Sequence, residues 1–274
     1  MSVKIALAGN PNSGKTTLFN ALTGSNQYVG NWPGVTVEKK EGKLKGHKDI
    51  IITDLPGIYS LSPYTLEEVV ARNYLIKEYP DAIINIIDGT NIERNLYLST
   101  QLIELGIPVI MAVNMMDLVK KNGDKIDIKN LSNALGCEVV EISALKGTGI
   151  DEVKEKAVAA AQKKVQNKRV HSFDQAVEDA IDSVSAKLTV EERKKRFFAI
   201  KLLEKDTKIA AQMDSVPDCK DEIKALEDKF DDDTESIITS ERYAYISSII
   251  GKCVKKNTNC LLYTSDAADD LIGV

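Results

Sequence analysis

Apolar runs and amphipathic stretches alternate along the first 165 residues. A short continuous apolar run is typical of a strand buried on both faces, and apolar residues spaced three and four positions apart are typical of a helix packed against it. Strands are predicted at residues 4–8, 35–45, 49–54, 82–88, 107–114 and 138–142. Helices are predicted at residues 16–22, 65–78, 91–105, 128–135 and 150–165. This alternation predicts an α/β fold with a mostly parallel sheet flanked by helices.

Beyond about residue 166 the strand-like runs end and a 3.6-residue period takes over. One helical face carries Phe173, Val177, Ile181, Val184 and Leu188. Residues 189–192 match a capping box and predict a helix start, and the acidic residues 231–233 suit the start of a longer helix. We therefore predict an α/β domain over residues 1–165, then a small all-helical domain over 166–260, joined by a polar, basic linker at 163–169.

The composition narrows the class of protein. The 36 Lys and Arg against 41 Asp and Glu give a net charge of −5, so no nucleic-acid partner is expected. Four scattered cysteines predict neither a disulfide scaffold nor a zinc site. No apolar stretch approaches the ~18–20 residues that cross a bilayer, so a soluble chain is expected. Residues 261–274 carry no apolar run and are expected to form a non-native or disordered tail.

A phosphate-binding loop lies between the first predicted strand and helix. Residues 9–16 read Gly-Asn-Pro-Asn-Ser-Gly-Lys-Thr, which matches G-x-x-x-x-G-K-[ST]. In such a loop backbone N–H groups surround the β-phosphate, Lys15 reaches the β- and γ-phosphates, and the Thr16 hydroxyl suits Mg²⁺. The predicted contacts are Gly9, Asn10, Pro11, Asn12, Ser13, Gly14, Lys15, Thr16 and Thr17. The loop alone leaves a kinase, an ATPase and a GTPase open.

A second motif follows the strand at residues 49–54. The sequence Asp-Leu-Pro-Gly occupies Asp54, Leu55, Pro56 and Gly57. A carboxylate at a strand end can hold Mg²⁺ through water, and the Gly57 N–H can reach the γ-phosphate. The pattern D-x-x-G alone is weak evidence for a nucleotide site. At this distance along the chain from a phosphate-binding loop, it becomes strong evidence for one.

Two further motifs indicate which base is bound. Asn114, Met115, Met116 and Asp117 follow one buried strand, and Ser143, Ala144 and Leu145 follow the next. The Asp117 carboxylate can accept hydrogen bonds from guanine N1–H and N2–H₂, a donor pair that adenine lacks. A backbone N–H of residues 143–145 can bind guanine O6. Because the carboxyl ends of parallel strands meet at one sheet edge, these motifs predict a GTP site there.

These four motifs make residues 1–165 resemble the translation-factor-like branch of small GTPases. Met115 stands where that class usually has Lys, and its side chain can still cover the base. Residues 30–38 read Gly-Asn-Trp-Pro-Gly-Val-Thr-Val-Glu and occupy the switch I position, where a Thr closes over Mg²⁺. Together with the phosphate loop and Asp-Leu-Pro-Gly-Ile-Tyr-Ser-Leu, this string resembles the N-terminal cytosolic part of the ferrous-iron transport protein B family.

That resemblance implies a GTPase domain, a helical domain likened to a nucleotide-dissociation inhibitor, and a membrane permease that this chain lacks. It implies GTP contacts at Pro33, Gly34, Val35, Thr36 and Val37, Mg²⁺ at Thr16, Thr36 and Asp54, and catalytic roles for Asn12, Lys15, Thr36 and Gly57. It implies a place on the cytoplasmic side of the membrane, in a protein that takes up ferrous iron. The implied partners are the permease of the parent protein, small cytosolic Feo proteins and further copies of the parent.

Resemblance to potassium-activated GTPases adds a candidate activator. There an Asn of the phosphate loop and two switch I carbonyls coordinate K⁺, and these match Asn12, Gly30 and Trp32. The cation offsets charge that develops in the transition state. Asn12 is equally compatible with a plain turn residue that bonds its own backbone.

Ile58 occupies the position where Ras-like enzymes use a glutamine to orient water. An aliphatic side chain holds no water by hydrogen bonds, so slow intrinsic hydrolysis is expected. Ile58 can instead be a core residue, with another side chain orienting the water. Two other functions stay open: a nucleotide-dependent binding switch with negligible hydrolysis, and a ribosome-assembly GTPase, for which an RNA-binding module is needed.

Overall fold

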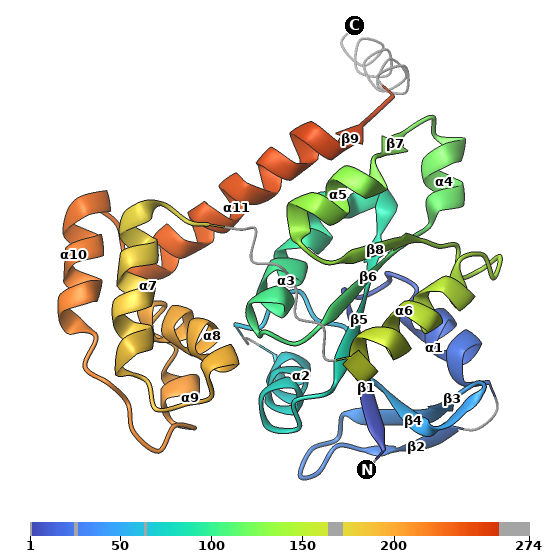
Figure 1. Ribbon diagram of the computed structural model, residues 1–274, viewed down its shortest axis with the longest axis horizontal. Coiled ribbons are helices and arrows are strands. Elements are labelled where there is room, and N and C mark those ends of the chain that lie inside the picture. Colours follow the sequence, from blue (N-terminus) through green and yellow to red (C-terminus); the bar gives the residue numbers. More distant parts are fainter. Residues whose placement is uncertain (1, 25–26, 63–64, 164–171, 258–274) are drawn as a thin grey trace, which may run out of the picture.

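A seven-stranded sheet forms the centre of the molecule in the computed structural model, which describes residues 2–24, 27–62, 65–163 and 172–257. The strand order is β2-β3-β4-β1-β5-β6-β8 (Figure 1). The strands are β1 (Val3–Gly9), β2 (Gln27–Asn31), β3 (Glu38–Leu44), β4 (His47–Asp54), β5 (Ala82–Asp88), β6 (Val109–Asn114) and β8 (Glu138–Glu141). From β4 to β8 neighbours run parallel, and β3 and β2 are antiparallel. The α/β prediction with a mostly parallel sheet is confirmed.

The antiparallel edge differs from the expected strand limits. The segment predicted as a strand at 35–45 becomes one only from Glu38, and β2 was not expected. The side chains of Tyr28 and Val29 in β2 are 67% and 54% exposed. An edge strand that faces solvent needs no apolar run, so the hydrophobic pattern that marks the central strands is missing here.

Helices cover both faces of the sheet. The helices α1 (Lys15–Thr23) and α6 (Ile150–Lys163) pack on one face with β1, β4 and β5. The helices α2 (Leu66–Lys77), α3 (Ile92–Glu104), α4 (Met116–Lys121) and α5 (Ile128–Leu135) pack on the other, and the 3₁₀ turn η1 (Gly89–Asn91) leads into α3. The capping box at the start of α2 forms as expected, because the Thr65 hydroxyl accepts from the Glu68 N–H.

The second part of the described chain is helical. Its helices are α7 (Gln175–Lys187), α8 (Glu192–Leu203), α9 (Thr207–Ala210), α10 (Lys220–Phe230) and α11 (Thr234–Cys253). Asp233 caps α11 as the acidic run predicted, but the expected cap by Thr189 is wrong. The α8 helix begins after Glu191, with no side-chain cap. Most of the linker at 163–169 and the tail at 261–274 lie outside the described residues.

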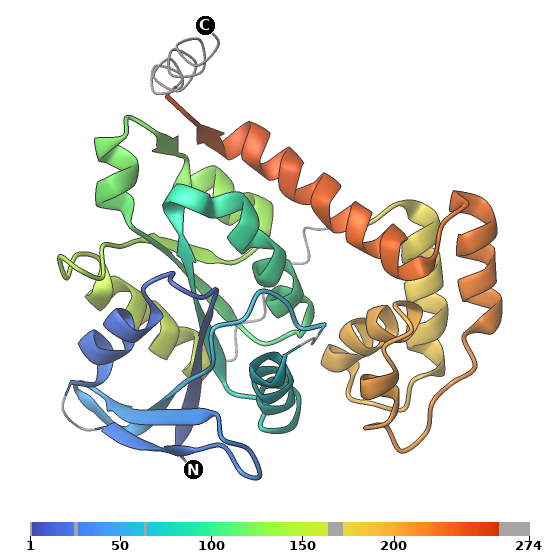
Figure 2. The ribbon, with the colours of Figure 1, turned by 180° about the vertical axis from the view of Figure 1, so that it is seen from behind.

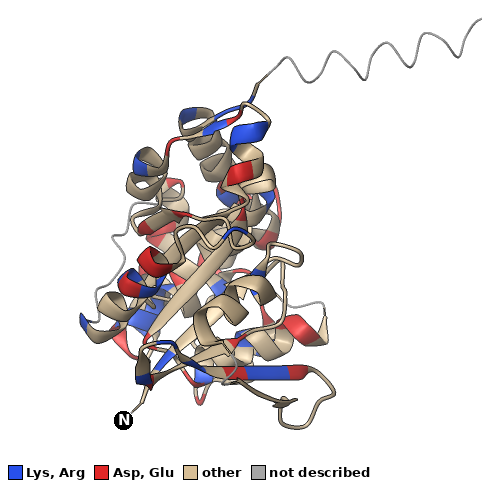
Figure 3. Ribbon diagram, turned by 90° about the vertical axis from the view of Figure 1, so that its right-hand side faces the viewer, with Lys and Arg blue, Asp and Glu red and all other residues tan. Residues whose placement is uncertain are grey.

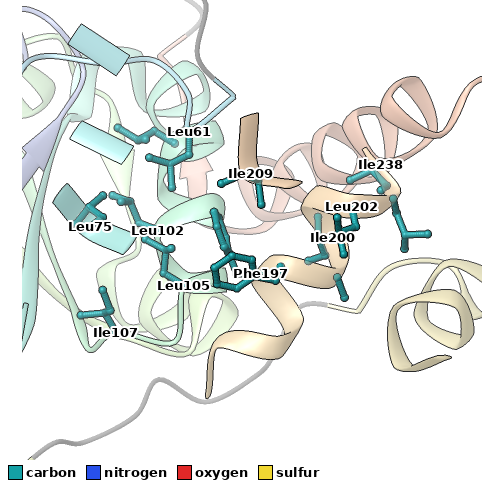
Figure 4. Packing of buried hydrophobic residues seen from close by; sticks show 14 of the residues in the cluster. Leu61, Leu75, Leu102, Leu105, Ile107, Phe197, Ile200, Leu202, Ile209 and Ile238 are labelled. Carbon is teal, nitrogen blue, oxygen red and sulfur yellow. The ribbon is translucent and has the colours of Figure 1, made fainter. Parts of the chain in front are cut away.

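The helical part packs on the α2–α3 side of the sheet, and α11 runs back across α3 and α5 (Figures 1 and 2). Beyond α11, β9 (Val254–Lys255) pairs antiparallel with β7 (Lys125–Ile126). Figure 4 shows the shared core, in which Phe197 and Ile209 of the helical part meet Leu61, Leu102 and Leu105. One apolar cluster therefore spans both parts of the chain.

Charged residues of both signs are interspersed along the elements seen in Figure 3. Within the described ranges, none of the helices has both the length and the hydropathy of a membrane span.

Candidate nucleotide-binding site

The loop that follows β1 is a tight turn that opens onto a helix start. The Ser13 N–H and Oγ both donate to the Asn10 carbonyl, at 3.3 and 2.8 Å. Asn12 and Gly14 adopt left-handed backbone conformations, with φ of +65° and +93°. Gly14 is the N-cap of α1 and offers no side-chain cap, so the first N–H groups of the helix have no cap oxygen. A helix N-terminus of this kind favours a bound phosphate.

Two glycines of the loop have no room for a side chain. A Cβ on Gly9 would lie 2.4 Å from the Ile86 carbonyl oxygen, and a Cβ on Gly14 would lie 2.3 Å from Asn114 Nδ2. The loop therefore sits directly against β5 and against the start of the predicted base-recognition motif. Close approach of the loop backbone to the Ile86 backbone and to the Asn114 side chain is what the glycines of the motif allow.

The lysine and the carboxylate of the two phosphate motifs are in contact. Lys15 Nζ lies 2.6 Å from Asp54 Oδ1, and both side chains are largely buried. Burial raises the pKa of Asp54, and the charge of Lys15 only partly opposes that effect. Thr16 and Thr17 lie exposed in the first turn of α1.

The segment after Asp54 runs alongside the phosphate loop. The Ile58 N–H donates to the Gly9 carbonyl at 3.2 Å. A Cβ on Gly57 would lie 3.1 Å from the Pro11 Cα, so residues 55–57 pass close to the loop. The Ile58 side chain itself is 1% exposed and belongs to the core shared with the helical part. It points into protein, which agrees with the reading of Ile58 as a core residue.

Asn114 ties three of the predicted motifs together. Its Nδ2 donates to the Ser13 carbonyl at 2.8 Å, and its Oδ1 accepts from the Ala144 N–H at 2.9 Å. The side chain is 4% exposed. Met115 follows with φ of +62° and caps α4. The phosphate loop and both base motifs are thus held in one hydrogen-bonded arrangement.

Asp117 lies in the first turn of α4 and forms an ion pair with Lys146 at 3.2 Å. A hydrogen bond from Lys146, with a further one from the Ser143 side chain, lowers the pKa of Asp117. The neighbouring Met116 is buried, whereas the Leu145 side chain is 87% exposed. The carboxylate is therefore ionised and can accept hydrogen bonds from a base.

Switch I extends the sheet. Gly30 lies in β2 opposite Lys39, rather than in the loop expected from the sequence. The Trp32 ring is buried edge-on against Tyr74, with centroids 5.3 Å apart. The Trp32 carbonyl accepts from the Val35 N–H at 3.2 Å, and its N–H donates to the Val37 carbonyl at 2.9 Å. Two of the residues expected to bind K⁺ through carbonyls are therefore held in strand and turn structure here.

The turn between β2 and β3 is open to solvent. Pro33, Gly34 and Thr36 are exposed, and Val35 and Val37 are half-buried against the shared core. Thr36 therefore faces outward, and closing it over a metal ion requires this turn to move. Such ordering of a switch loop by a nucleotide is the ordinary behaviour of GTPases.

The donors present fit a magnesium ion that is shared with phosphate. The Asp54 carboxylate and the Thr16 hydroxyl are hard oxygen ligands. The described residues contain no cluster of three or more His, Cys, Asp or Glu that could hold a metal without a ligand. Both side-chain polar atoms of Asn10 are buried without a hydrogen-bond partner within the described structure.

Several residues near switch II, the segment 58–68 that follows the Asp-Leu-Pro-Gly motif, were not predicted from the sequence. Gln101 Oε1 accepts from the Leu61 N–H at 2.6 Å and from Ser60 Oγ at 3.1 Å. Lys201 Nζ donates to Ser62 Oγ at 2.7 Å from the helical part. Arg72 of α2 pairs with Asp206 at 2.9 Å. No local motif marks these residues, because each partner lies 40 or more positions away in the chain.

Comparisons with known proteins agree with this geometry. Residues 3–157 match the family model "Ferrous iron transport protein B", and residues 173–255 match the model "FeoB cytosolic helical domain". The Fe(2+) transporter FeoB of Methanocaldococcus jannaschii is 41% identical over 283 residues, which cover 99% of this chain and 42% of that relative. The chain thus spans about two fifths of this relative's length.

Solved structures are similar over nearly the whole chain. A GDP-bound variant of S. thermophilus NFeoB has a TM-score of 0.88 and 48% identity, covering 92% of this chain and 100% of that one. The mGMPPNP-bound NFeoB of S. thermophilus has a TM-score of 0.82 and 48% identity, covering 92% and 97%. The chain therefore belongs to the FeoB family of ferrous iron transport proteins, and carries its nucleotide-binding G domain followed by its cytosolic helical region.

Proposed function

We propose that this chain binds GTP and GDP with Mg²⁺ and hydrolyses GTP, and that this cycle regulates or powers ferrous iron uptake by the full-length protein. The observation that carries the proposal is the meeting of four motifs at one sheet edge. Asn114 joins the phosphate loop to Ala144, and Lys15 lies against Asp54. The nucleotides bound to the similar NFeoB structures support the same ligand class.

Each motif then has a defined task. Backbone N–H groups of residues 9–17 other than Pro11 surround the phosphates, and Lys15 moves from Asp54 to the β- and γ-phosphate oxygens. Asp54 and Thr16, joined by Thr36 when switch I closes, would hold Mg²⁺. The Gly57 N–H donates to the γ-phosphate. Mg²⁺ supplies charge neutralisation of the triphosphate.

The base is selected by Asp117 together with residues 143–145. Lys146 is replaced as the partner of the Asp117 carboxylate by guanine N1–H and N2–H₂. The Ala144 N–H donates to Asn114 Oδ1, and the Ser143 N–H donates to the Thr148 carbonyl. Either N–H group would therefore have to exchange its present partner in order to donate to guanine O6.

Potassium is the proposed activator. Asn12 projects from a left-handed turn and is exposed, which leaves its side chain available to a cation. The Trp32 carbonyl accepts from the Val35 N–H, so its coordination to K⁺ requires the turn after β2 to rearrange. Burial of Ile58 means that the attacking water is oriented by another group.

The helical region is proposed to slow GDP release. Its Lys201 and Asp206 contact Ser62 of switch II and Arg72 of α2. In the full-length protein we place this region on the cytoplasmic side of the membrane, in contact with the permease domain, small cytosolic Feo proteins and further copies of the protein. Residues 1–165 and 166–260 are proposed as the two domains, with 261–274 outside both.

A GTP hydrolysis assay on the whole chain tests the proposal. A single-turnover measurement in Mg²⁺ and K⁺ is expected to show release of phosphate from GTP and none from ATP. Binding of GTP without phosphate release would instead support a nucleotide-dependent switch, a function that the burial of Ile58 also fits. Failure to bind any guanine nucleotide would overturn both.

A further inference from the structure

The helix that carries Asp117 is held at its two ends by different parts of the chain. At its start, Met115 is in the left-handed conformation and Asn114 is bound to the phosphate loop. The helix α4 is only six residues long, so it depends on what holds its other end. That end leads into residues 122–127.

Residues 254–257, which we call the C-terminal strap, lie against this end. Val254 and Lys255 pair with Ile126 and Lys125 in the small β7–β9 sheet. The Asp127 N–H donates to the Cys253 carbonyl at 2.8 Å. The strap and Cys253, the last residue of α11, thus add backbone hydrogen bonds to the segment that follows α4, and Figure 1 shows β9, β7 and α4 side by side.

Asn257 forms hydrogen bonds with the turn between α4 and β7. Its N–H donates to Asp124 Oδ1 at 2.8 Å, and its Nδ2 donates to the Asn122 carbonyl at 3.3 Å. A Cβ on Gly123 would lie 2.6 Å from Asn257 Nδ2, so the two segments are in close contact. Asn122 is the C-cap of α4, and the Asp124 N–H donates to the Val119 carbonyl within that helix.

The same elements are joined by an apolar cluster. Ile249 and Cys253 at the end of α11 share one buried cluster with Met116 and Val119 of α4. The ion pair of Lys120 with Glu141 also touches α4, but both side chains are exposed and such pairs contribute little. The C-terminal half of α4 is therefore supported by the strap and the end of α11 together with η1, where a Cβ on Gly89 would lie 3.1 Å from Val119 Cγ2.

We propose that the C-terminal strap is a positioning element for guanine recognition. It holds α4 and thereby sets the position of Asp117. The inference rests on the proposed binding of guanine nucleotides. Loosening the strap lets α4 tilt, which weakens the hydrogen bonds of Asp117 to the base while the phosphate loop is untouched. The effect is therefore on base discrimination and on the rate of GDP release.

Two substitutions in the whole chain test this. Asp124→Ala removes the acceptor of the Asn257 N–H, and Asn257→Ala removes the bond to the Asn122 carbonyl. Each is compared for binding of GDP and of IDP, which lacks the 2-amino group. The double variant is expected to bind GDP about fivefold more weakly, the scale of one net hydrogen bond, with the GDP-to-IDP affinity ratio lowered about threefold.

The matched control is Gln212→Ala. Gln212 Nε2 donates to Asn73 Oδ1 at 3.1 Å, so this variant also breaks a polar contact between the helical part and the sheet part, but on the far side from α4. The GDP-to-IDP affinity ratio of this variant is expected to equal that of the wild type. A general loss of stability would weaken GDP and IDP binding alike, which separates a structural role from a positioning role.

Hydrogen exchange gives an independent readout on the wild type. Coupling between two sites is reciprocal, so GDP is expected to slow exchange at the Asp127 and Asn257 amides. An unchanged GDP-to-IDP ratio in the double variant, or exchange at these amides that GDP does not alter, would overturn the proposal. Absence of any GDP binding by the wild type would instead refute the proposed function.

Discussion

Lys15 and Asp54 form a short ion pair, with Nζ 2.6 Å from Oδ1, at the point where the two predicted phosphate motifs meet. In the nucleotide cycle proposed above, each of these charges has another partner, Lys15 a phosphate and Asp54 a hydrated Mg²⁺. The ion pair gives both charges a partner. In the proposed cycle a magnesium–nucleotide complex would replace both partners at once, whereas nucleotide alone would leave Asp54 unpaired and Mg²⁺ alone would leave Lys15 unpaired.

Removing the Asp54 charge is expected to uncouple nucleotide binding from Mg²⁺. The Asp54→Asn variant should lose about tenfold in Mg²⁺ affinity, the usual scale for a group that holds a metal through its outer shell. The measurement is the affinity for GMPPNP in Mg²⁺ and in EDTA. In EDTA the variant should match or exceed the wild type, because Lys15 is then free. Equal Mg²⁺ dependence in the two proteins would remove Asp54 from the metal site.

Replacing Asn12 is expected to abolish stimulation by potassium. GTP turnover of the wild type should be at least about tenfold faster in K⁺ than in Na⁺, because the cation takes the place of a transition-state arginine. Asn12→Ala should show the low rate in both salts. The rate in Na⁺ serves as the internal control. A wild type that turns over equally in K⁺ and Na⁺ would rule out this role.

Arg242 is expected to be a large contributor to stability. It is fully buried and pairs with Glu104 of α3 at 2.8 Å and with Glu204, the C-cap residue of α8. The Arg242→Met variant leaves both carboxylates buried without this partner, a change that destabilises by about 3–5 kcal/mol. The free energy of unfolding, measured in urea for the variant and the wild type, gives this loss of stability. The exposed pair of Lys229 with Asp174 is the control, because Lys229→Ala should cost no more than about 1 kcal/mol.

Acid is expected to lower the stability of the folded chain through Glu204, whose carboxylate pairs with Arg242 and Lys201. Burial alone would raise the pKa of this carboxyl, but Arg242 and Lys201 outweigh it and lower the pKa to about 2 from 4.5. The unfolded chain therefore takes up this proton first, and stability falls as the pH falls from 4.5 towards 2.

The Glu204→Gln variant should be less stable near neutral pH and should show a flatter loss in acid, measured as unfolding free energy against pH. Asp54 acts in the opposite sense, because its pKa in the folded chain is raised above 3.8. Its contribution to the free energy of unfolding therefore falls as the pH rises above 3.8. A Glu204→Gln variant with the same acid slope as the wild type would show that other carboxyls dominate.

The sequence predicted those parts that local chemistry specifies. The glycines, lysine and threonine of the phosphate loop are needed at fixed spacing, so the motif alone located the loop and α1. Central strands such as β5 are buried on both faces and therefore carry continuous apolar runs. The capping box of Thr65 and Glu68 is likewise a local hydrogen-bond pair, and it forms as expected.

Other features had no local signal. The edge strand β2 is exposed and lacks an apolar run, and Thr189 satisfies the capping pattern yet does not cap α8. The sequence also leaves open where Ile58 points. In the structure Ile58 is buried in the apolar cluster that both parts of the chain share.

By itself, then, the sequence determined the order of the elements, the phosphate and base motifs and the family that carries them. Each of these follows from the type and spacing of residues that are close together in the sequence. The tertiary structure alone decided which distant residues meet: Lys201 with Ser62, Arg242 with Glu104, and Asn257 with Asp124. These pairs are more than 100 positions apart, and their meeting depends on how an apolar core shared by both parts of the chain is packed.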